Sequence, residues 1–282
     1  MLVTLRDTLQ KAFQNNYAVA GLVTLGWEDM MAYIEAAEKE KCPVILQAGP
    51  SCRQHTPLPI LGKMFNYLAD NTSVPVVAHL DHGYSEEECK IAIDSGFSSI
   101  MFDGSRKSLN ENIDQTAKIC EIAHSAGVSC EGEIGFVGYS GGEVSAGTVP
   151  EEASRFAIST NIDAMAISVG NIHLQENKEG GLDEDRIRTI EEVTHIPLVI
   201  HGGSGVPVAQ RTFLSQNSKI CKFNIGTELR FSFGDALRES VNRYPNRFDR
   251  VQILKDTHEP LVNKTREVLK AFKPVKSKIW II

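Results

Sequence analysis

The chain has 282 residues, 42% of them hydrophobic, and a formal net charge of −7 with an isoelectric point of about 5.7. A chain of this length can bury a large core in one α/β domain, and the acidic balance without basic runs argues against nucleic acid as a partner. No apolar run approaches the roughly 18 residues that a membrane helix needs. Six cysteines without a CxxC pair argue against a disulfide framework. We therefore expect a cytoplasmic protein that works on a small molecule and not at a membrane.

Short apolar runs rich in Val, Ile and Ala recur along the whole chain. Most are continuous rather than alternating, which is typical of parallel strands buried on both faces. The sequence predicts eight such strands, at residues 17–23, 43–48, 75–81, 98–105, 128–135, 164–170, 197–203 and 220–226.

Amphipathic segments with helix start signals separate these runs. Ser85 with Glu88 resembles a capping box, and Pro150 opens a helix with acidic residues in its first turn. Residues 183–194 and 206–216 predict two further helices, and the charged tail from about residue 245 is also helical in pattern. Eight strand–helix units predict a single (β/α)8 TIM barrel domain over residues 1–282 with a C-terminal helical tail.

Three histidines stand just past apolar runs: His82 in PVVAHLDHG, His173 in AMAISVGNIH and His201 in PLVIHGGSG. A strand-end histidine on its own is usually satisfied by a backbone hydrogen bond. Three in equivalent positions of a barrel can meet at one ion, where they would supply the nitrogen ligands of an open catalytic zinc site. Asp81 lies beside the first of them. His79, embedded in the same run, is expected to be structural.

Glycine-rich segments follow the last two predicted strands. The first is HGGSG at residues 201–205 and the second is NIGT at residues 224–227. Barrel enzymes commonly bind phosphate at these two loops through backbone N–H groups and a helix N-terminus. A phosphorylated small molecule is the expected ligand. A metal beside a phosphate site favours chemistry on a carbonyl compound.

The motifs HLDHG, EGEIG, VGNIH, HGGSG and KFNIGTE, in this order, resemble those of the class II, zinc-dependent ketose-bisphosphate aldolases. The resemblance implies cleavage of a phosphorylated ketose to dihydroxyacetone phosphate and an aldehyde through a zinc-stabilised enediolate. It also implies a monovalent cation, Na⁺ or K⁺, near the phosphate loops, and a homodimer or homotetramer.

Carried over residue by residue, the resemblance implies that Asp81 is the acid/base at the C4 oxygen and that Asp103 is a carboxylate near the metal. The implied metal ligands are His82, His173 and His201, with Glu133 as an additional or alternate ligand. The implied phosphate-binding residues are Gly170, Gly202, Ser204, Asn224, Gly226 and Thr227.

The chain departs from the family pattern on the side that would face the aldehyde. Val23 stands where the family motif AFN has its amide, Leu174 replaces a glycine after the third-motif histidine, and Arg106 lies in the divergent end of the fourth strand. Glu143, in Gly-Gly-Glu-Val, is the candidate for the loop acid/base. These changes leave the aldehyde open.

Two other functions keep the metal and the phosphate: a sugar-phosphate epimerase or isomerase that uses the same enediolate, and a non-catalytic binding homologue. A Schiff-base aldolase is disfavoured because no apolar run presents an obvious inward lysine.

Overall fold

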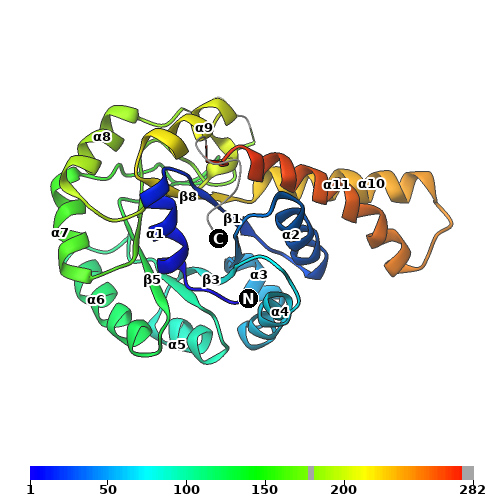
Figure 1. Ribbon diagram of the computed structural model, residues 1–282, viewed down its shortest axis with the longest axis horizontal. Coiled ribbons are helices and arrows are strands. Elements are labelled where there is room, and N and C mark those ends of the chain that lie inside the picture. The colour runs from blue at the N-terminus through cyan, green and yellow to red at the C-terminus, as the bar shows by residue number, and fades with distance from the viewer. Residues whose placement is uncertain (177–180, 275–282) are drawn as a thin grey trace.

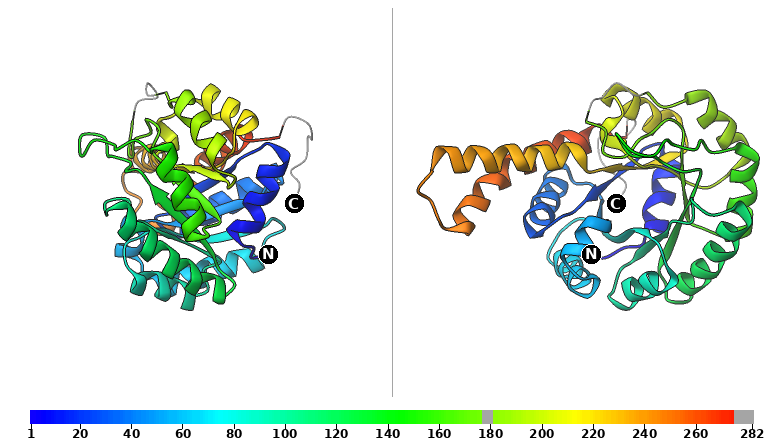
Figure 2. Two further views of the ribbon diagram at one scale, coloured as in Figure 1. Left: turned by 90° about the vertical axis from the view of Figure 1, so that its left-hand side faces the viewer. Right: turned by 180° about the vertical axis from the view of Figure 1, so that it is seen from behind.

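The computed structural model describes residues 1–176 and 181–274. Within them, parallel strands form a closed barrel in the order of the sequence, each hydrogen-bonded to the next and β8 to β1. Helices surround the barrel (Figures 1 and 2), as the (β/α)8 prediction requires. The strands are β1 (Val19–Val23), β2 (Val44–Ala48), β3 (Val76–Gly83), β4 (Ser99–Phe102), β5 (Ser129–Ile134), β6 (Ala164–Ile167), β7 (Leu198–Ile200) and β8 (Ile220–Ile225).

All the predicted strands are present, but β4, β6 and β7 are shorter than their apolar runs. After β6 and β7 the chain leaves the sheet and turns at Gly170 (φ 96°) and Gly202 (φ 65°). Both lie in the left-handed region that glycine adopts without strain. The residues beyond these strands therefore belong to the loops at the carboxyl end of the barrel.

The helices begin and end close to the predicted positions, and Pro150 is the first residue of its helix. Ser85 caps the backbone N–H of Glu88, but the Glu88 carboxylate accepts from Tyr84 N–H instead of completing the capping box. In the described part of the chain, no helix combines the length and apolarity required to cross a bilayer. The helices are α1 (Leu5–Asn15), α2 (Trp27–Glu40), α3 (Pro50–His55), α4 (Leu58–Asp70), α5 (Glu86–Asp94), α6 (Leu109–Ser125), α7 (Pro150–Thr160), α8 (Glu184–Val193), α9 (Val208–Asn217), α10 (Thr227–Arg243) and α11 (Arg250–Lys270), with a 3₁₀ turn η1 at Gly203–Gly205.

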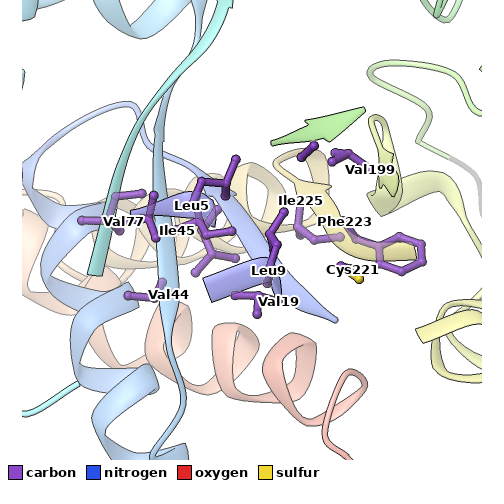
Figure 3. Packing of buried hydrophobic residues seen from close by; sticks show 14 of the residues in the cluster. Leu5, Leu9, Val19, Val44, Ile45, Val77, Val199, Cys221, Phe223 and Ile225 are labelled. Carbon is purple, nitrogen blue, oxygen red and sulfur yellow. The ribbon is translucent and has the colours of Figure 1, made fainter. Parts of the chain in front are cut away.

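Helix α1 covers the amino end of the barrel. Its Leu5 and Leu9 are fully buried and lie among the strand residues Val19 and Cys221 (Figure 3). The helix contacts β1, β3, β5 and β8. Burial of a leucine contributes about 1.5–3 kcal/mol, so the apolar face of α1 seals this end. The opposite end, where the strands finish, stays open to ligands.

The predicted C-terminal helix is α11. It packs antiparallel to α10 and against α2, and the two long helices project from the side of the barrel as a hairpin (Figure 1). Since α10 begins directly after β8, the same hairpin fixes the loop that precedes it.

A buried ion pair joins α9 to the first turn of α10. Arg211 is 1% exposed and its Nη1 lies 2.6 Å from the Glu228 carboxylate. Thr227, a predicted phosphate ligand, is the residue before Glu228. The ion pair therefore holds the start of α10 at the mouth of the barrel.

Replacing Arg211 with Met should lower the free energy of unfolding by about 3 kcal/mol, because the largely buried Glu228 carboxylate loses its closest cation while Lys264 remains at 3.8 Å. Denaturant unfolding would measure the change. Arg238→Met is the matched control. The Arg238–Asp235 pair on α10 is exposed and should contribute less than about 1 kcal/mol to stability. Equal effects in the two variants would contradict this role for Arg211.

Candidate active site

The three histidines meet at the carboxyl end of the barrel, although they come from different kinds of position. His82 lies within β3, His201 directly follows β7, and His173 lies in the loop after β6. Backbone hydrogen bonds to the β5–α7 loop hold His173 there, from His173 N–H to Gly138 O (2.8 Å) and from Ser140 N–H to His173 O (2.9 Å). One ring nitrogen of each histidine lies within 4.8 Å of the others.

Carboxylates orient two of these rings. His82 Nδ1 donates to Asp103 (2.8 Å), and His201 Nε2 donates to Glu131 (3.2 Å). The remaining nitrogens, His82 Nε2 and His201 Nδ1, face each other at 2.9 Å. Two nitrogens on a tetrahedral zinc, with bonds of about 2.0–2.1 Å, lie about 3.3 Å apart. A small adjustment would let both rings bind one ion.

The pKa values of these histidines diverge. Burial lowers the pKa of His82, but the charge of Asp81 and the hydrogen bond to Asp103 outweigh it and raise this pKa to about 9. Burial, followed by the charge of His82, lowers the pKa values of His173 and His201 well below the ordinary range. In the metal-free protein His82 therefore carries the proton shared with His201. A metal would take the place of that proton.

A buried polar network lies beneath the histidines. Lys222 on β8 is fully buried, and its Nζ contacts the Glu131 carboxylate (2.6 Å) and His79 Nε2 (3.1 Å). His79 Nδ1 in turn contacts Ser99 Oγ at 2.8 Å, which matches its expected structural role. The sequence argument that no strand carries an inward lysine was therefore wrong. Lys222 is nevertheless paired with Glu131 and does not line the cavity described below.

Glu133 on β5 lies close behind the histidines. It is 1% exposed, and its Oε2 has no hydrogen-bond partner within the described chain. This oxygen is 3.8 Å from His82 Nδ1 and 3.8 Å from His201 Nδ1. Burial, with the nearby charge of Asp103, raises the pKa of Glu133 well above its usual value. An unsatisfied buried oxygen of this kind is costly, and a cation beside it would remove the cost.

Asp81 lies next to the histidines and is 5% exposed. Burial raises its pKa, but the charges of His82, His201 and Lys222 outweigh this and lower the pKa below the usual value. Asn224 Nδ2 donates to it at 3.3 Å. Asp81 is therefore an ionised, acceptor-only group at neutral pH.

The turn that presents Asp81 and His82 is strained. His82 has φ 55°, the left-handed region, which costs a non-glycine residue about 1–3 kcal/mol. Arg53 on α3 holds the turn: its guanidinium donates to the carbonyls of Asp81 (2.8 Å) and His82 and pairs with Glu88.

The site opens into a cavity of about 280 Å³. Ser204 Oγ accepts from the N–H groups of Gly226 (3.1 Å) and Glu228 (3.4 Å), which joins η1 to the start of α10. Most of the predicted phosphate residues line this cavity. Its lining comprises Val23, Gly49, Pro50, Ser51, Asp81, His82, Tyr139, His173, Leu174, Gly202, Ser204, Asn224, Gly226, Thr227 and Arg230.

Two predicted site residues lie elsewhere. Gly170 and Glu143 line a neighbouring cavity. The Glu143 side chain is 56% exposed and pairs with Arg106 at 2.6 Å, while the Arg106 guanidinium lies over the Phe136 ring. The structure therefore does not bring Glu143 or Gly170 to the histidine cavity in this conformation of the loop.

The departures from the family pattern appear at the cavity wall. Leu174 has φ 55°, so a leucine occupies a backbone conformation that suits glycine, and its half-exposed side chain lines the cavity beside His173. Val23 contributes an apolar side chain at the end of β1.

Sequence reasoning missed several residues that build the site. Arg53 and Arg230 come from helices α3 and α10, where a charged residue normally signals only a solvated face. Tyr139 stacks on His173 at 4.8 Å. Asn171 donates to His201 O (3.0 Å) and accepts from Val169 N–H (2.8 Å). The one available signal for Asn171 was its position between Gly170 and His173 in the VGNIH motif.

Comparisons with known proteins show which family the chain belongs to. The family model for class II fructose-bisphosphate aldolase matches residues 3–276. The chain is 36% identical over 262 residues to a fructose-bisphosphate aldolase of Geobacillus stearothermophilus, covering 90% of each chain. It is also 36% identical over 258 residues to a 6-phospho-5-dehydro-2-deoxy-D-gluconate aldolase of Shouchella clausii, covering 88% of this chain and 86% of the relative.

Among solved structures, the YdjI aldolase of Escherichia coli K12 superposes with a TM-score of 0.85 at 28% identity, covering 98% of this chain and 99% of that one. The match extends over the barrel and the helical hairpin together. The chain belongs to the class II fructose-bisphosphate aldolase family.

Proposed function

We propose that the protein is a zinc-dependent aldolase that cleaves a phosphorylated ketose to dihydroxyacetone phosphate and an aldehyde. The observation that carries the proposal is the meeting of three imidazoles beside an ionised carboxylate, Asp81, in the cavity formed with the loops after β7 and β8. Family relatives with different substrates support aldol chemistry without fixing the aldehyde.

The donor set suits zinc. His82, His173 and His201 provide nitrogen atoms and leave a fourth position for substrate. The unsatisfied Glu133 oxygen offers an additional or alternate ligand, and Asp103 orients His82. When bound, zinc would supply Lewis acidity for the ketose carbonyl and stabilise the enediolate charge.

Asp81 takes the proton in the cleavage direction. Its lowered pKa keeps it ionised, and Asn224 orients one of its oxygens. The carboxylate accepts the proton of the C4 hydroxyl as the C3–C4 bond breaks and its electron pair passes to the enediolate. Asn224 also lines the cavity and is placed to donate to an enediolate oxygen.

The C1 phosphate binds at the loops after β7 and β8. Gly202, Ser204, Gly226 and Thr227 line this side of the cavity, and the 17-residue helix α10 begins at Thr227. Backbone N–H groups at a helix N-terminus favour an anion. Gly170 lines the neighbouring cavity, and its positive φ allows the turn that leads to His173.

Glu143 is the proposed acid that protonates the enediolate carbon. Its loop holds two successive glycines, and a Cβ at Gly141 would meet nothing within 4 Å. Closure of this loop over the cavity would exchange the Arg106 contact for the substrate.

Asp81→Ala should reduce ketose phosphate cleavage by at least about 10²-fold, because the proton acceptor is lost. Metal analysis should find zinc retained, since Asp81 is not one of the nitrogen ligands. A coupled triose phosphate assay across ketose phosphates would measure cleavage. Full activity of chelator-treated, metal-free wild-type protein would overturn the zinc mechanism, and epimerised product without triose phosphate would favour the isomerase function.

Asp103→Asn should weaken zinc binding by about 10- to 100-fold, as for other carboxylates that orient a ligand histidine. Competition with a chromophoric chelator would measure the affinity. Asp114→Asn, on the exposed face of α6, is the matched control and should leave it unchanged. Identical affinities for both variants would show that Asp103 does not position His82.

Glu143→Gln should lower turnover by about 10²- to 10⁴-fold if Glu143 transfers a proton to or from carbon. The same loss should appear in solvent deuterium exchange into dihydroxyacetone phosphate, which needs no aldehyde. Glu176→Gln alters another exposed carboxylate of the same neighbouring cavity and should change neither rate. Wild-type exchange in Glu143→Gln would assign the acid to another residue.

A further inference from the structure

Two of the six cysteines lie against each other between a helix and a strand. Cys120 lies on α6, which packs outside β5, and Cys130 is the second residue of β5 (Figure 1). Both are buried, with exposed fractions of 1% and 0%, and the Cys130 thiol is hydrogen-bonded to Cys120. The pair lies at the amino end of β5, away from the histidine cavity, so the proposed aldol chemistry does not use it.

An imidazole lies beside Cys120. His124, one turn further along α6, has its Nδ1 3.7 Å and its Nε2 3.6 Å from Cys120 Sγ. His124 Nε2 also lies 2.9 Å from the Asp163 carboxylate. When Nε2–H donates to Asp163, Nδ1 is an acceptor for the thiol proton, which now goes to Asn161 O at 3.1 Å. Among the described residues, Cys120 is the only cysteine within hydrogen-bond distance of an imidazole.

Asp163 holds this cluster together. Its carboxylate accepts from Cys130 N–H (2.8 Å) and from Arg6 Nε (2.5 Å), and Asp163 N–H donates to Cys130 O (2.8 Å). The Arg6 guanidinium offsets the negative charge of Asp163, which would otherwise disfavour a thiolate nearby. Cys120, Cys130, His124 and Asp163 therefore form one cluster of two thiols, an imidazole and a carboxylate.

The two thiols differ in their surroundings. The hydrogen bond to Cys120, followed by burial, raises the pKa of Cys130 well above its ordinary value, so Cys130 stays protonated. Cys120 has a base beside it in His124, whose side chain is 20% exposed. Cys120 also lies within the last two turns of α6. Because helix ends fray, a transient opening there would admit a small oxidant to the Cys120 sulfur.

We propose that Cys120 and Cys130 are a hydroperoxide-sensitive thiol pair that forms a reversible disulfide between α6 and β5. This goes beyond the aldolase function and does not depend on it. The Cys120 sulfur attacks one oxygen of hydrogen peroxide while His124 takes its proton. The S–O bond forms, the O–O bond breaks, and the leaving hydroxide takes that proton to become water. Cys130 then attacks the sulfenic sulfur: the S–S bond forms, and the second oxygen leaves as water with the Cys130 proton. The two thiols lose two electrons, and one peroxide is reduced to two waters.

The disulfide would join the two elements that fix the carboxylates beneath the histidines. Cys130 directly precedes Glu131, which contacts His201 Nε2, and Asn112 of α6 donates to Glu133 O at 2.9 Å. The sulfur atoms of a disulfide lie about 2.05 Å apart, closer than two thiols in contact. Its formation would therefore draw α6 and β5 together next to Glu131.

The test maps the thiols of the folded, full-length protein. Reduced protein is treated with equimolar hydrogen peroxide, alkylated and digested without reductant, and the peptides are identified by mass spectrometry. We expect a peptide pair linked through Cys120 and Cys130, formed before the other cysteines react and separated by dithiothreitol. Three results would overturn the proposal: a Cys120 thiol that stays free, a link from either sulfur to the neighbouring Cys89, or a link that forms only in urea-unfolded protein.

Variants separate the roles of the cluster. Cys130→Ser should leave Cys120 as a sulfenic acid that dimedone labels, whereas Cys221→Ser, which alters another buried thiol, should still form the disulfide. His124→Gln should slow the oxidation of Cys120 by at least about 10-fold, and His195→Gln, at an exposed histidine, should not. Equal rates in the two histidine variants would contradict the role of His124 as the base. Thermal unfolding of the reduced variants checks that each has folded, and the wild-type map does not depend on them.

Discussion

The geometry of the site depends on one ion pair inside the barrel, between Lys222 on β8 and Glu131 on β5. Both side chains are fully buried, so neither charge could be tolerated there without the other. The pair keeps Glu131 as an acceptor, and that carboxylate fixes the His201 ring so that Nδ1 faces His82 Nε2. The Lys222–Glu131 pair thus determines which histidine nitrogens would be available to a metal at the carboxyl end of the barrel.

The mouth itself is strained where the chemistry is proposed. His82 and Leu174 both have φ 55°, conformations that cost free energy in non-glycine residues. Arg53 ties the His82 turn to α3 and α5 through carbonyl and carboxylate contacts. For Leu174, the backbone conformation suits the glycine of the family pattern while the side chain now contributes to the cavity wall. The cavity wall can change in this way without moving the backbone that carries the histidines.

The two sides of the cavity have different physical character. The β7–β8 side presents hydroxyl groups and backbone donors tied together by Ser204. The β1 side presents the apolar Val23 and the cationic Arg230. Buried contacts, including Arg211 with Glu228, hold the first turn of α10 between them. One helix end therefore lines both the side of the cavity proposed for the phosphate and the β1 side.

The sequence by itself determined the barrel, because eight strand–helix units with continuous apolar runs are typical of a closed parallel sheet covered by helices. It also determined most of the residues at the carboxyl end of the barrel, because barrels place functional groups at strand ends. Tertiary structure decided what spacing along the chain cannot encode. His173 reaches the site through a loop held at Gly138, Lys222 finds Glu131 across the closed barrel, and Arg230 faces the cavity rather than solvent. Each depends on barrel closure, which brings distant segments together and removes water from some charges but not from others.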